Sequence, residues 1–261
     1  MEKVLITGAS KGIGLSIAKK LIEEGYKVYG TCRNPENVDS KIEGLHYIKL
    51  DLSKPFDAQT LYEATGPIDI LINNAGQSQI GAMEDTDIIN YKALFDINVF
   101  GLIEVCKTYL PSMRTKQKGT ILNIGSLTGK FPLPFYSAYV GSKYAVEGIT
   151  QSLRIELESF GIKVVLIDPN DIKTSITPTF LCPQESAYFE KANKIKNKVK
   201  SKMSNASSAD VISQAVSKII QLKNPKPVYN LGGNAKILVF LKRIVSTRFL
   251  HKSIAKTYDL S

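Results

Sequence analysis

The sequence predicts an α/β fold: a doubly wound, Rossmann-type parallel sheet of about seven strands with helices on both faces. Short runs that are apolar throughout alternate with longer amphipathic runs as far as residue 168. Strands of this kind, joined by helices, belong to parallel sheets that are covered on both faces. The sequence has no internal repeat and no linker rich in Gly, Ser or Pro, so we expect one domain over residues 1–261.

The predicted elements follow in order along the chain. Strands are expected at KVLIT (3–7), KVYGTC (27–32), HYIKL (46–50), DILIN (69–73), TILNIGS (120–126), KVVLID (163–168) and PVYNLGG (227–233). Helices are expected after the first strand as far as Glu24, near 57–64, from about Asp87 to Met113, and from Ser137 to Ser159.

Composition limits the class of protein. Hydrophobic residues make up 43% and charged residues 22%, which is typical of soluble globular chains. No apolar run approaches the roughly 18 residues of a membrane span, and the chain enters a strand pattern too early for a signal peptide. The cysteines Cys32, Cys106 and Cys182 are odd in number and lack metal spacing. We therefore expect reduced thiols, a cytoplasmic protein and no metal.

The formal net charge of +10 calls for an explanation. It can be a general solubility charge, or it can attract nucleic acid, an anionic membrane surface or an anionic small molecule. The basic residues concentrate in the C-terminal third, and KANKIKNKVKSK (191–202) has no interleaved stacking aromatics. This distribution argues against nucleic acid.

The glycine-rich loop TGASKGIG (7–14) lies between the first strand and the first helix. Gly8 permits the tight turn, while Gly12 and Gly14 let backbone N–H groups and the helix N-terminus approach a pyrophosphate. A glycine turn that serves packing alone is the other interpretation. The position between a strand and a helix favours dinucleotide binding.

The spacing T-G-x-x-x-G-x-G, together with NNAG (73–76), resembles the short-chain dehydrogenase/reductase family. The resemblance extends from the first strand to about residue 232. It implies that the cofactor lies along the loop and the strand ends. The residues implied in cofactor binding there are Gly8, Ser10, Lys11, Gly12, Ile13 and Gly14 in the loop, Asp51 and Leu52 beside the adenine, and Asn74 beside the adenosine ribose.

The end of the second strand predicts which nicotinamide cofactor binds. An acidic residue there favours NAD, whereas a basic one accommodates the 2′-phosphate of NADP. The sequence reads TCRN, so Arg33 occupies this place, and Lys11 can reach the same phosphate. Both can instead be solvated surface charges. We expect NADP(H).

The stretch YSAYVGSKY (136–144) holds three tyrosines and one lysine. Tyr139 and Lys143 are one helical turn apart on one face, whereas Tyr136 is two turns away and Tyr144 points elsewhere. Geometry therefore favours Tyr139 as the acid–base group. A nearby ammonium and a positive nicotinamide ring both lower the pKa of a phenol.

The family resemblance adds the partners of Tyr139. Ser126, Tyr139 and Lys143 correspond to the catalytic triad, and Asn98 to the asparagine of a water-linked proton relay. Lys143 is also implied in holding the nicotinamide ribose. The expected reaction is hydride transfer to or from a carbonyl or carbinol carbon, with Tyr139 moving the proton and Ser126 binding the oxygen. Taken one by one, these residues also have structural explanations.

The loop DPNDIKT (168–174) follows the sixth predicted strand. The family pattern has glycine where Asn170 stands, and asparagine tolerates left-handed backbone angles better than most residues. The resemblance implies contacts from Ile172 and Thr174 to the nicotinamide amide.

Two segments distinguish the C-terminal third. Residues 174–209 correspond to the substrate lid of the family, and residues 234–261 form an amphipathic tail in which apolar and basic residues alternate. The tail can lie on a lipid interface, or it can pack over the substrate cleft or a partner subunit. Similar tails in the family accompany hydrophobic substrates such as steroids, retinoids or lipid-derived ketones.

Two other functions compete with this expectation. One is a 3-oxoacyl-carrier-protein reductase, whose acidic carrier would meet the lysines of the lid. The other is a non-catalytic protein that senses NADP(H), although such relatives commonly lack the tyrosine or the lysine. Family habit also implies a dimer or tetramer formed through the two long helices.

Overall fold

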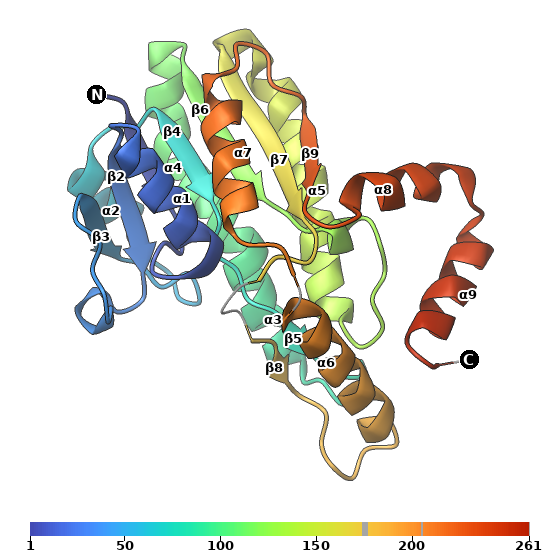
Figure 1. Ribbon diagram of the computed structural model, residues 1–261. Helices are drawn as coiled ribbons and strands as arrows, with labels where there is room; N and C mark the ends of the chain where they lie inside the picture. Colours follow the sequence, from blue (N-terminus) through green and yellow to red (C-terminus); the bar gives the residue numbers. More distant parts are fainter. Residues whose placement is uncertain (174–176, 205, 261) are drawn as a thin grey trace.

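The computed structural model describes residues 1–173, 177–204 and 206–260. Its core is a seven-stranded parallel sheet in the order β3-β2-β1-β4-β6-β7-β9 (Figure 1). The strands are β1 (Lys3–Ile6), β2 (Lys27–Cys32), β3 (Leu45–Lys49), β4 (Ile70–Asn73), β6 (Gly119–Ile124), β7 (Ile162–Pro169) and β9 (Val228–Leu231). The doubly wound α/β fold predicted from the alternating pattern is confirmed.

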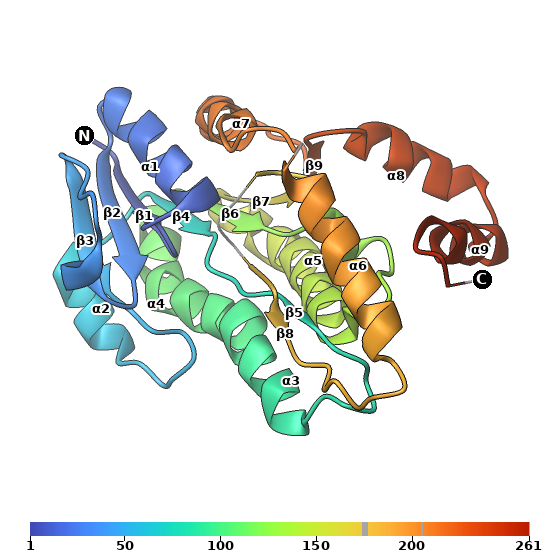
Figure 2. The same cartoon turned by 60° about the horizontal axis from the view of Figure 1, so that its bottom comes forward.

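Helices cover both faces of the sheet (Figure 2). One face carries α1 (Gly12–Glu23) and α7 (Asp210–Gln221), which pack side by side over one apolar cluster. The other carries α2 (Ala58–Thr65), α4 (Gly101–Lys116) and α5 (Ser137–Leu157) over a second cluster. The strands are buried on both faces, which explains why they are apolar throughout.

The sheet reverses its winding between β1 and β4. Strand β1 pairs with both β2 and β4, so the chain winds outward to β3 and then returns to the other side of β1. The loops that follow β1 and β4 therefore leave the same edge in opposite directions. Open α/β sheets bind ligands in the crevice at such a switch point.

The long helix expected from Asp87 to Met113 contains an irregular turn. Helix α3 (Ile88–Phe95) continues through the π-helical segment η2 (Asp96–Phe100) into α4. A π-helical turn adds a residue to one turn and frequently marks a functional site. Asn98, a residue implicated by the sequence, lies in this segment.

The lid segment holds more regular structure than the sequence pattern indicated. Strand β8 (Thr179–Phe180) pairs with β5 (Gln79–Ile80) outside the main sheet. Helix α6 (Phe189–Ser204) follows and contains the lysine run. Thr174, expected near the nicotinamide, lies outside the described residues.

The tail forms two helices, α8 (Ala235–Ile244) and α9 (Thr247–Thr257), which extend to one side of the sheet (Figure 1). The break falls at Val245 and Ser246, both in extended conformation, and the Ser246 hydroxyl caps α9 by accepting from the Phe249 N–H. Within the described ranges, no helix is both long and apolar enough to cross a bilayer.

Candidate active site

The glycine-rich loop brings its backbone close to the start of α1. Gly8 and Gly12 have φ values of +68° and +60°, which favour glycine. A Cβ on Gly14 would lie 2.3 Å from the Gly8 carbonyl oxygen and 2.5 Å from Asn74 Nδ2. The first turn of α1 has no acidic residue, and Lys11 precedes it. This cradle of free N–H groups fits the pyrophosphate of a dinucleotide.

Asn74 holds the glycine-rich loop in place. Its Nδ2 donates to the carbonyl oxygens of Thr7 and Gly8, each at 3.0 Å, while its backbone N–H donates to Thr7 Oγ1. Asn73 instead ties β4 to β6 by donating to Asn123 Oδ1 at 2.9 Å. The contact of Asn74 with the adenosine ribose stays a prediction.

The predicted adenosine end contains a basic and an acidic side chain. Arg33 is exposed directly after β2, and Asp51 follows β3 on the neighbouring strand. Hydrogen bonds from Ser53 hold the pKa of Asp51 below its usual value, with a further contribution from the charge of Arg33. Leu52 packs against Gly101, where an added Cβ would lie 2.9 Å from Leu52 Cβ. Arg33 is therefore accessible to a phosphate at this edge.

Tyr139 and Lys143 lie together on α5, as the helical spacing predicts. The Nζ of Lys143 is 5.9 Å from the centroid of the Tyr139 ring. Lys143 is only 6% exposed, and its Nζ donates to the Ile124 carbonyl oxygen at 3.0 Å. Burial lowers the pKa of Lys143 to about 8, with Asp168 opposing the shift. The ammonium group of Lys143 is therefore held in place beside the Tyr139 phenol.

The hydroxyl of Ser126 lies beside the hydroxyl of Tyr139. Its Oγ accepts hydrogen bonds from the N–H and the Oγ1 of Thr128, at 3.2 Å and 2.8 Å. A serine hydroxyl that accepts twice still has its own proton to donate. Burial raises the pKa of Tyr139, and the hydroxyls of Ser126 and Thr128 oppose that effect. Lowering this pKa toward neutrality therefore requires additional positive charge.

Asn98 connects the π-helical segment to the loop after β4. Its Oδ1 accepts from the Gln77 N–H at 2.8 Å, and its Nδ2 donates to the Gln77 carbonyl at 2.9 Å and to Ser142 Oγ at 3.0 Å. Gly76 lies between the two functional side chains: an added Cβ would be 3.3 Å from Asn98 Oδ1 and 3.8 Å from Lys143 Nζ. Asn98 and Lys143 thus both approach Gly76, and the place of Asn98 in a water-linked relay stays a prediction.

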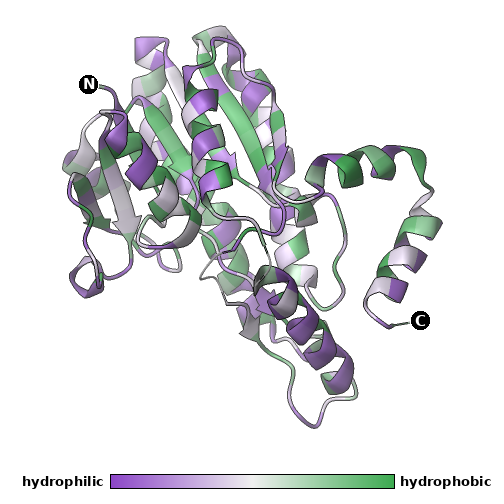
Figure 3. Cartoon of the chain, in the orientation of Figure 1, coloured by the Kyte–Doolittle hydropathy of each residue, from purple (hydrophilic) through white to green (hydrophobic). Residues whose placement is uncertain are grey.

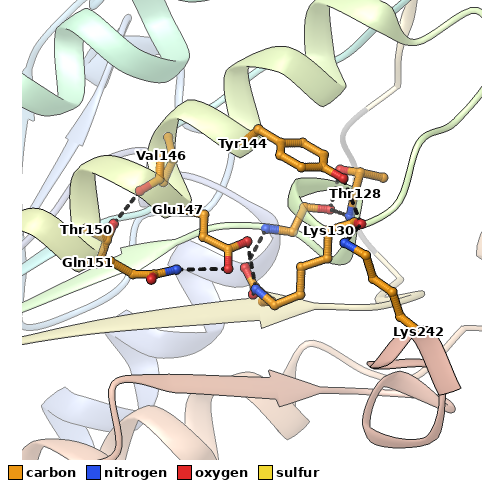
Figure 4. Close-up of polar contacts among 10 residues, drawn as sticks. Thr128, Lys130, Tyr144, Val146, Glu147, Thr150, Gln151 and Lys242 are labelled. Carbon is orange, nitrogen blue, oxygen red and sulfur yellow. Dashed lines mark hydrogen bonds and ion pairs between the residues drawn. The ribbon is translucent and has the colours of Figure 1, made fainter. Parts of the chain in front are cut away.

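Sequence reasoning missed Asp168, which is the second-last residue of β7 and is 1% exposed. Its carboxylate accepts from the Ser126 N–H at 3.0 Å and pairs with Lys130 Nζ at 2.5 Å. Lys130 also pairs with Glu147 of α5 at 2.8 Å (Figure 4). Burial raises the pKa of Asp168, and Lys130 opposes this rise. The sequence signal was an acidic residue at the end of a buried strand.

The loop after β7 takes its left-handed residue one position later than the sequence suggested. Asp171 has φ +44°, whereas Asn170 is absent from the positive-φ residues. Ile172 is 6% exposed and forms a backbone bridge with Ser207. Its side chain therefore packs in the core, and only its backbone is free to meet a nicotinamide amide.

An apolar cluster lies beside Tyr139. Its buried members are Ile80, Tyr136 and Ile195, and the side chains packed against them are Leu133, Phe135, Tyr139, Val140, Phe180, Val199, Tyr258 and Leu260. The Tyr136 and Tyr139 rings are 6.3 Å apart in an edge-to-face arrangement. The lid, the loop before α5 and the end of the tail thus meet next to the Tyr139 phenol.

The comparisons with known proteins agree with this geometry. Residues 2–182 match the family model described as short chain dehydrogenase. The chain is 34% identical to a 3-ketodihydrosphingosine reductase of Bacteroides thetaiotaomicron, over 90% of this chain and 89% of the relative. It is 32% identical to an NADPH-dependent 1-acyldihydroxyacetone phosphate reductase of Saccharomyces cerevisiae, over 98% and 91%.

A solved short-chain dehydrogenase from Streptomyces avermitilis superposes with a TM-score of 0.79 at 25% identity, covering 99% of this chain and 97% of that one. The match extends through the sheet, the lid and the tail. Together with the family model and the curated relatives, it shows that the chain belongs to the short-chain dehydrogenase/reductase family, whose members act on CH–OH groups.

Proposed function

We propose that this protein is an NADP(H)-dependent oxidoreductase that transfers a hydride between the nicotinamide and a carbonyl, or a primary or secondary alcohol, of a hydrophobic substrate. Steroid-, retinoid- or lipid-like molecules form the substrate class. The observation that carries the proposal is the apolar cluster around Ile80, Tyr136 and Ile195, which is packed against Tyr139. The relatives named for 3-ketodihydrosphingosine and 1-acyldihydroxyacetone phosphate support a lipid-like ketone.

NADP(H) is the proposed cofactor because two basic residues border its expected 2′-phosphate. Lys11 and Arg33 are both exposed, and neither forms an ion pair with an acidic side chain in the ranges that the structure describes. The yeast relative is named as NADPH-dependent. Ser10, Gly12, Ile13 and Gly14 are proposed to bind the phosphates, and Asp51, Leu52 and Asn74 the adenosine.

The bound nicotinamide supplies the hydride chemistry, and the chain supplies the proton and the position. Tyr139 gives its proton to the substrate oxygen in reduction and takes it back in oxidation. Ser126 donates its remaining hydroxyl proton to that oxygen as negative charge develops. Lys143 stabilises the phenolate, orients the ribose, and connects Tyr139 to Asn98.

The acyl-carrier alternative depends on free lysines in α6, and three of the six lysines in the run have contacts within the chain. Lys196 lies 4.1 Å from the centroid of Phe180, and Lys198 pairs with Asp259 at 3.3 Å. Lys202 lies 5.1 Å from the Tyr258 ring. These three lysines contact the lid and the tail, while Lys191, Lys194 and Lys200 are exposed. The apolar cluster beside Tyr139 is what favours a small hydrophobic substrate over an acidic carrier.

Assembly and location complete the proposal. We infer a dimer or tetramer, because α3, the π-helical segment and α5 expose Ile88, Phe100 and Ile155 at 65%, 54% and 75%. A cytoplasmic enzyme that contacts a membrane peripherally through residues 234–261 would meet a lipid-like substrate where it is most concentrated.

The decisive variant is Tyr139→Phe. We expect it to lower turnover of any accepted ketone by at least about a hundredfold, because general acid–base catalysis contributes that much or more. NADPH binding, measured by fluorescence titration, should change by less than about threefold, since the ring stays in place. Wild type would first be screened by NADPH oxidation against ketones of graded size and polarity. Robust turnover by the variant would overturn the role of Tyr139.

A further inference from the structure

The two tail helices carry an outward surface that the fold leaves uncovered. On α8, Ile237, Phe240, Leu241 and Ile244 recur at the spacing of one helical face, and they are 59%, 62%, 42% and 66% exposed. Phe249 of α9 adds a side chain that is 61% exposed. These five residues are called the tail surface. Figure 3 shows α8 as largely hydrophobic, in contrast to the hydrophilic α6.

The opposite face of the tail already contacts the body of the protein. Ala235 is 1% exposed, and Lys242 Nζ donates to the Lys130 carbonyl and lies 5.5 Å from the Phe131 ring (Figure 4). At the end of α9, Tyr258 and Leu260 pack against the apolar cluster. These contacts fix which side of each tail helix faces outward. The tail surface lies on the outward side, so it is not needed to attach the tail to the rest of the chain.

Basic side chains accompany the tail surface on both tail helices. Arg248, Lys252 and Lys256 follow one another at four-residue spacing and share a face of α9, and Lys236 and Arg243 flank the apolar stripe of α8. All five are exposed, and none forms an ion pair with an acidic side chain within the described residues. The one acidic residue of 234–261, Asp259, pairs with Lys198.

We propose that the tail surface binds the interface of an anionic lipid bilayer. Exposed apolar side chains on helices that also carry exposed cations complement the acyl chains and the acidic headgroups of such a bilayer. A second copy of the chain is a poorer occupant, because a symmetric contact would bring the same five cations of each copy together. This inference deepens the proposed function by naming the surface and the lipid charge. It rests on the proposed membrane contact and is independent of the substrate.

The test uses the full chain and sedimentation with large vesicles. Wild type should bind vesicles of mixed phosphatidylcholine and phosphatidylglycerol, bind vesicles of phosphatidylcholine alone at least about tenfold more weakly, and dissociate as salt is added. The variant Phe240→Ser with Ile244→Ser keeps the charge and should weaken binding at least about tenfold. Its control, Val211→Ser with Leu222→Ser, removes two exposed apolar side chains at the two ends of α7, 40% and 43% exposed, and should behave as wild type.

A second pair of variants tests the charge. Arg248→Gln with Lys252→Gln should weaken binding to the anionic vesicles about tenfold, whereas the control Lys223→Gln with Lys226→Gln should have little effect. The proposal is overturned if wild type does not bind anionic vesicles at low salt, or if it binds both kinds of vesicle equally. It is also overturned if the control variants lose as much vesicle binding as the tail variants. A change of oligomeric state in the Phe240 and Ile244 variant, without weaker vesicle binding, assigns the surface to a subunit contact and also overturns it.

Oxidation of NADPH with a water-soluble ketone, measured without vesicles, separates this inference from the proposed reaction. All four variants should retain the wild-type rate, because none of their residues borders Tyr139. If wild type binds anionic vesicles but reduces no ketone, the reaction fails and the surface stands. If wild type reduces ketones but binds no vesicles, the proposed reaction stands and the membrane-binding surface is refuted.

Discussion

At the scale of single residues, the candidate site consists of charges held by burial. Lys143 is nearly enclosed, is bonded to the Ile124 carbonyl, and has a pKa lowered to about 8. Asp168 is enclosed as well, with Lys130 as its counter-ion. Both arrangements cost stability, since a buried charge loses hydration. In return, Lys143 lies beside the Tyr139 phenol, and Asp168 holds the backbone of Ser126 in place.

The Lys143→Met variant should show this cost directly. In the folded protein Lys143 releases its proton near pH 8, and in the unfolded chain near the ordinary 10.5, so burying the charge costs about 3 kcal/mol at neutral pH. The unfolded state binds more protons between these values, so wild-type stability rises with pH across this window. Near pH 7 the variant should be more stable by about 1–3 kcal/mol, since it loses one hydrogen bond but buries no charge.

Urea unfolding of both proteins across this window measures the effect. The difference between variant and wild type should shrink as the pH rises from 8 to 10.5, because the lysine is then neutral in the folded wild type as well. Tyr139 and Asp168 are present in both proteins and cancel to first order. A difference that is constant with pH would show that Lys143 is not buried as a cation.

The Arg33→Asp variant tests the cofactor preference. A carboxylate at this position would repel the 2′-phosphate and accept hydrogen bonds from the ribose of NAD. Each charge-assisted hydrogen bond contributes about 1.5–3 kcal/mol, so the ratio of kcat/KM for NADPH to that for NADH should fall at least about a hundredfold. Lys223→Asp, a charge change at an exposed residue far along the chain, should leave the ratio as it is. An unchanged ratio in Arg33→Asp would refute the 2′-phosphate contact.

At the scale of elements, the active side chains come from the ends of strands and from one helix face. The spacing of Tyr139 and Lys143 alone predicted their contact, because helix geometry is local. The position of Ser126 followed from a strand end. The position of Asp168 near a strand end was a signal, but its contacts could not be predicted, because its partners Ser126 and Lys130 are about 40 residues away and adjacent strands bring them together only in the sheet. Similarly, no sequence signal marked the π-helical turn at Asn98.

The Asn98→Ala variant tests the π-helical segment. It would leave the N–H and the carbonyl of Gln77 without their side-chain partner, whereas Ser142 Oγ would lose one hydrogen bond and keep the one that it donates to the Tyr139 carbonyl. We expect a loss of about 1–3 kcal/mol in the free energy of unfolding, the usual cost of an unsatisfied buried polar group. The same variant should lower kcat more than it weakens NADPH binding, since Asn98 holds Ser142, the residue next to Lys143 on α5. Lys107→Ala on the exposed face of α4 is the control, and equal destabilisation by both would argue against a special role for Asn98.

At the scale of the whole molecule, the periodicity of the sequence predicted the sheet but not the arrangement of its C-terminal additions. The alternation of strands and helices is enough to define a doubly wound sheet. The division of the tail at Val245 and Ser246 depends on a capping serine within an unbroken amphipathic pattern. The return of α9 to α6 depends on tertiary contacts such as that of Lys198 with Asp259. These long-range contacts have no local signal.

We expect the return of the tail to the lid to affect which sizes of substrate the protein accepts. Tyr258 lies under Lys198 and Lys202 of α6 and also packs against the apolar cluster that contains Tyr136. One side chain therefore joins the tail, the lid and the space beside Tyr139. A long hydrophobic substrate would contact this wall, whereas a small ketone would occupy only the region next to the phenol.

The Tyr258→Ala variant should therefore separate large from small substrates. Removing the aromatic side chain takes away apolar contact worth about 1.5 kcal/mol or more, so KM for a long-chain ketone should rise about tenfold. The kcat/KM for a short, water-soluble ketone should stay within about twofold, because Tyr139, Ser126 and Lys143 are untouched. His251→Ala, at an exposed position of the same helix, should affect neither substrate. Equal effects on both ketones would mean that Tyr258 supports the fold without forming part of the substrate wall, and the tail would then have no part in selecting the substrate.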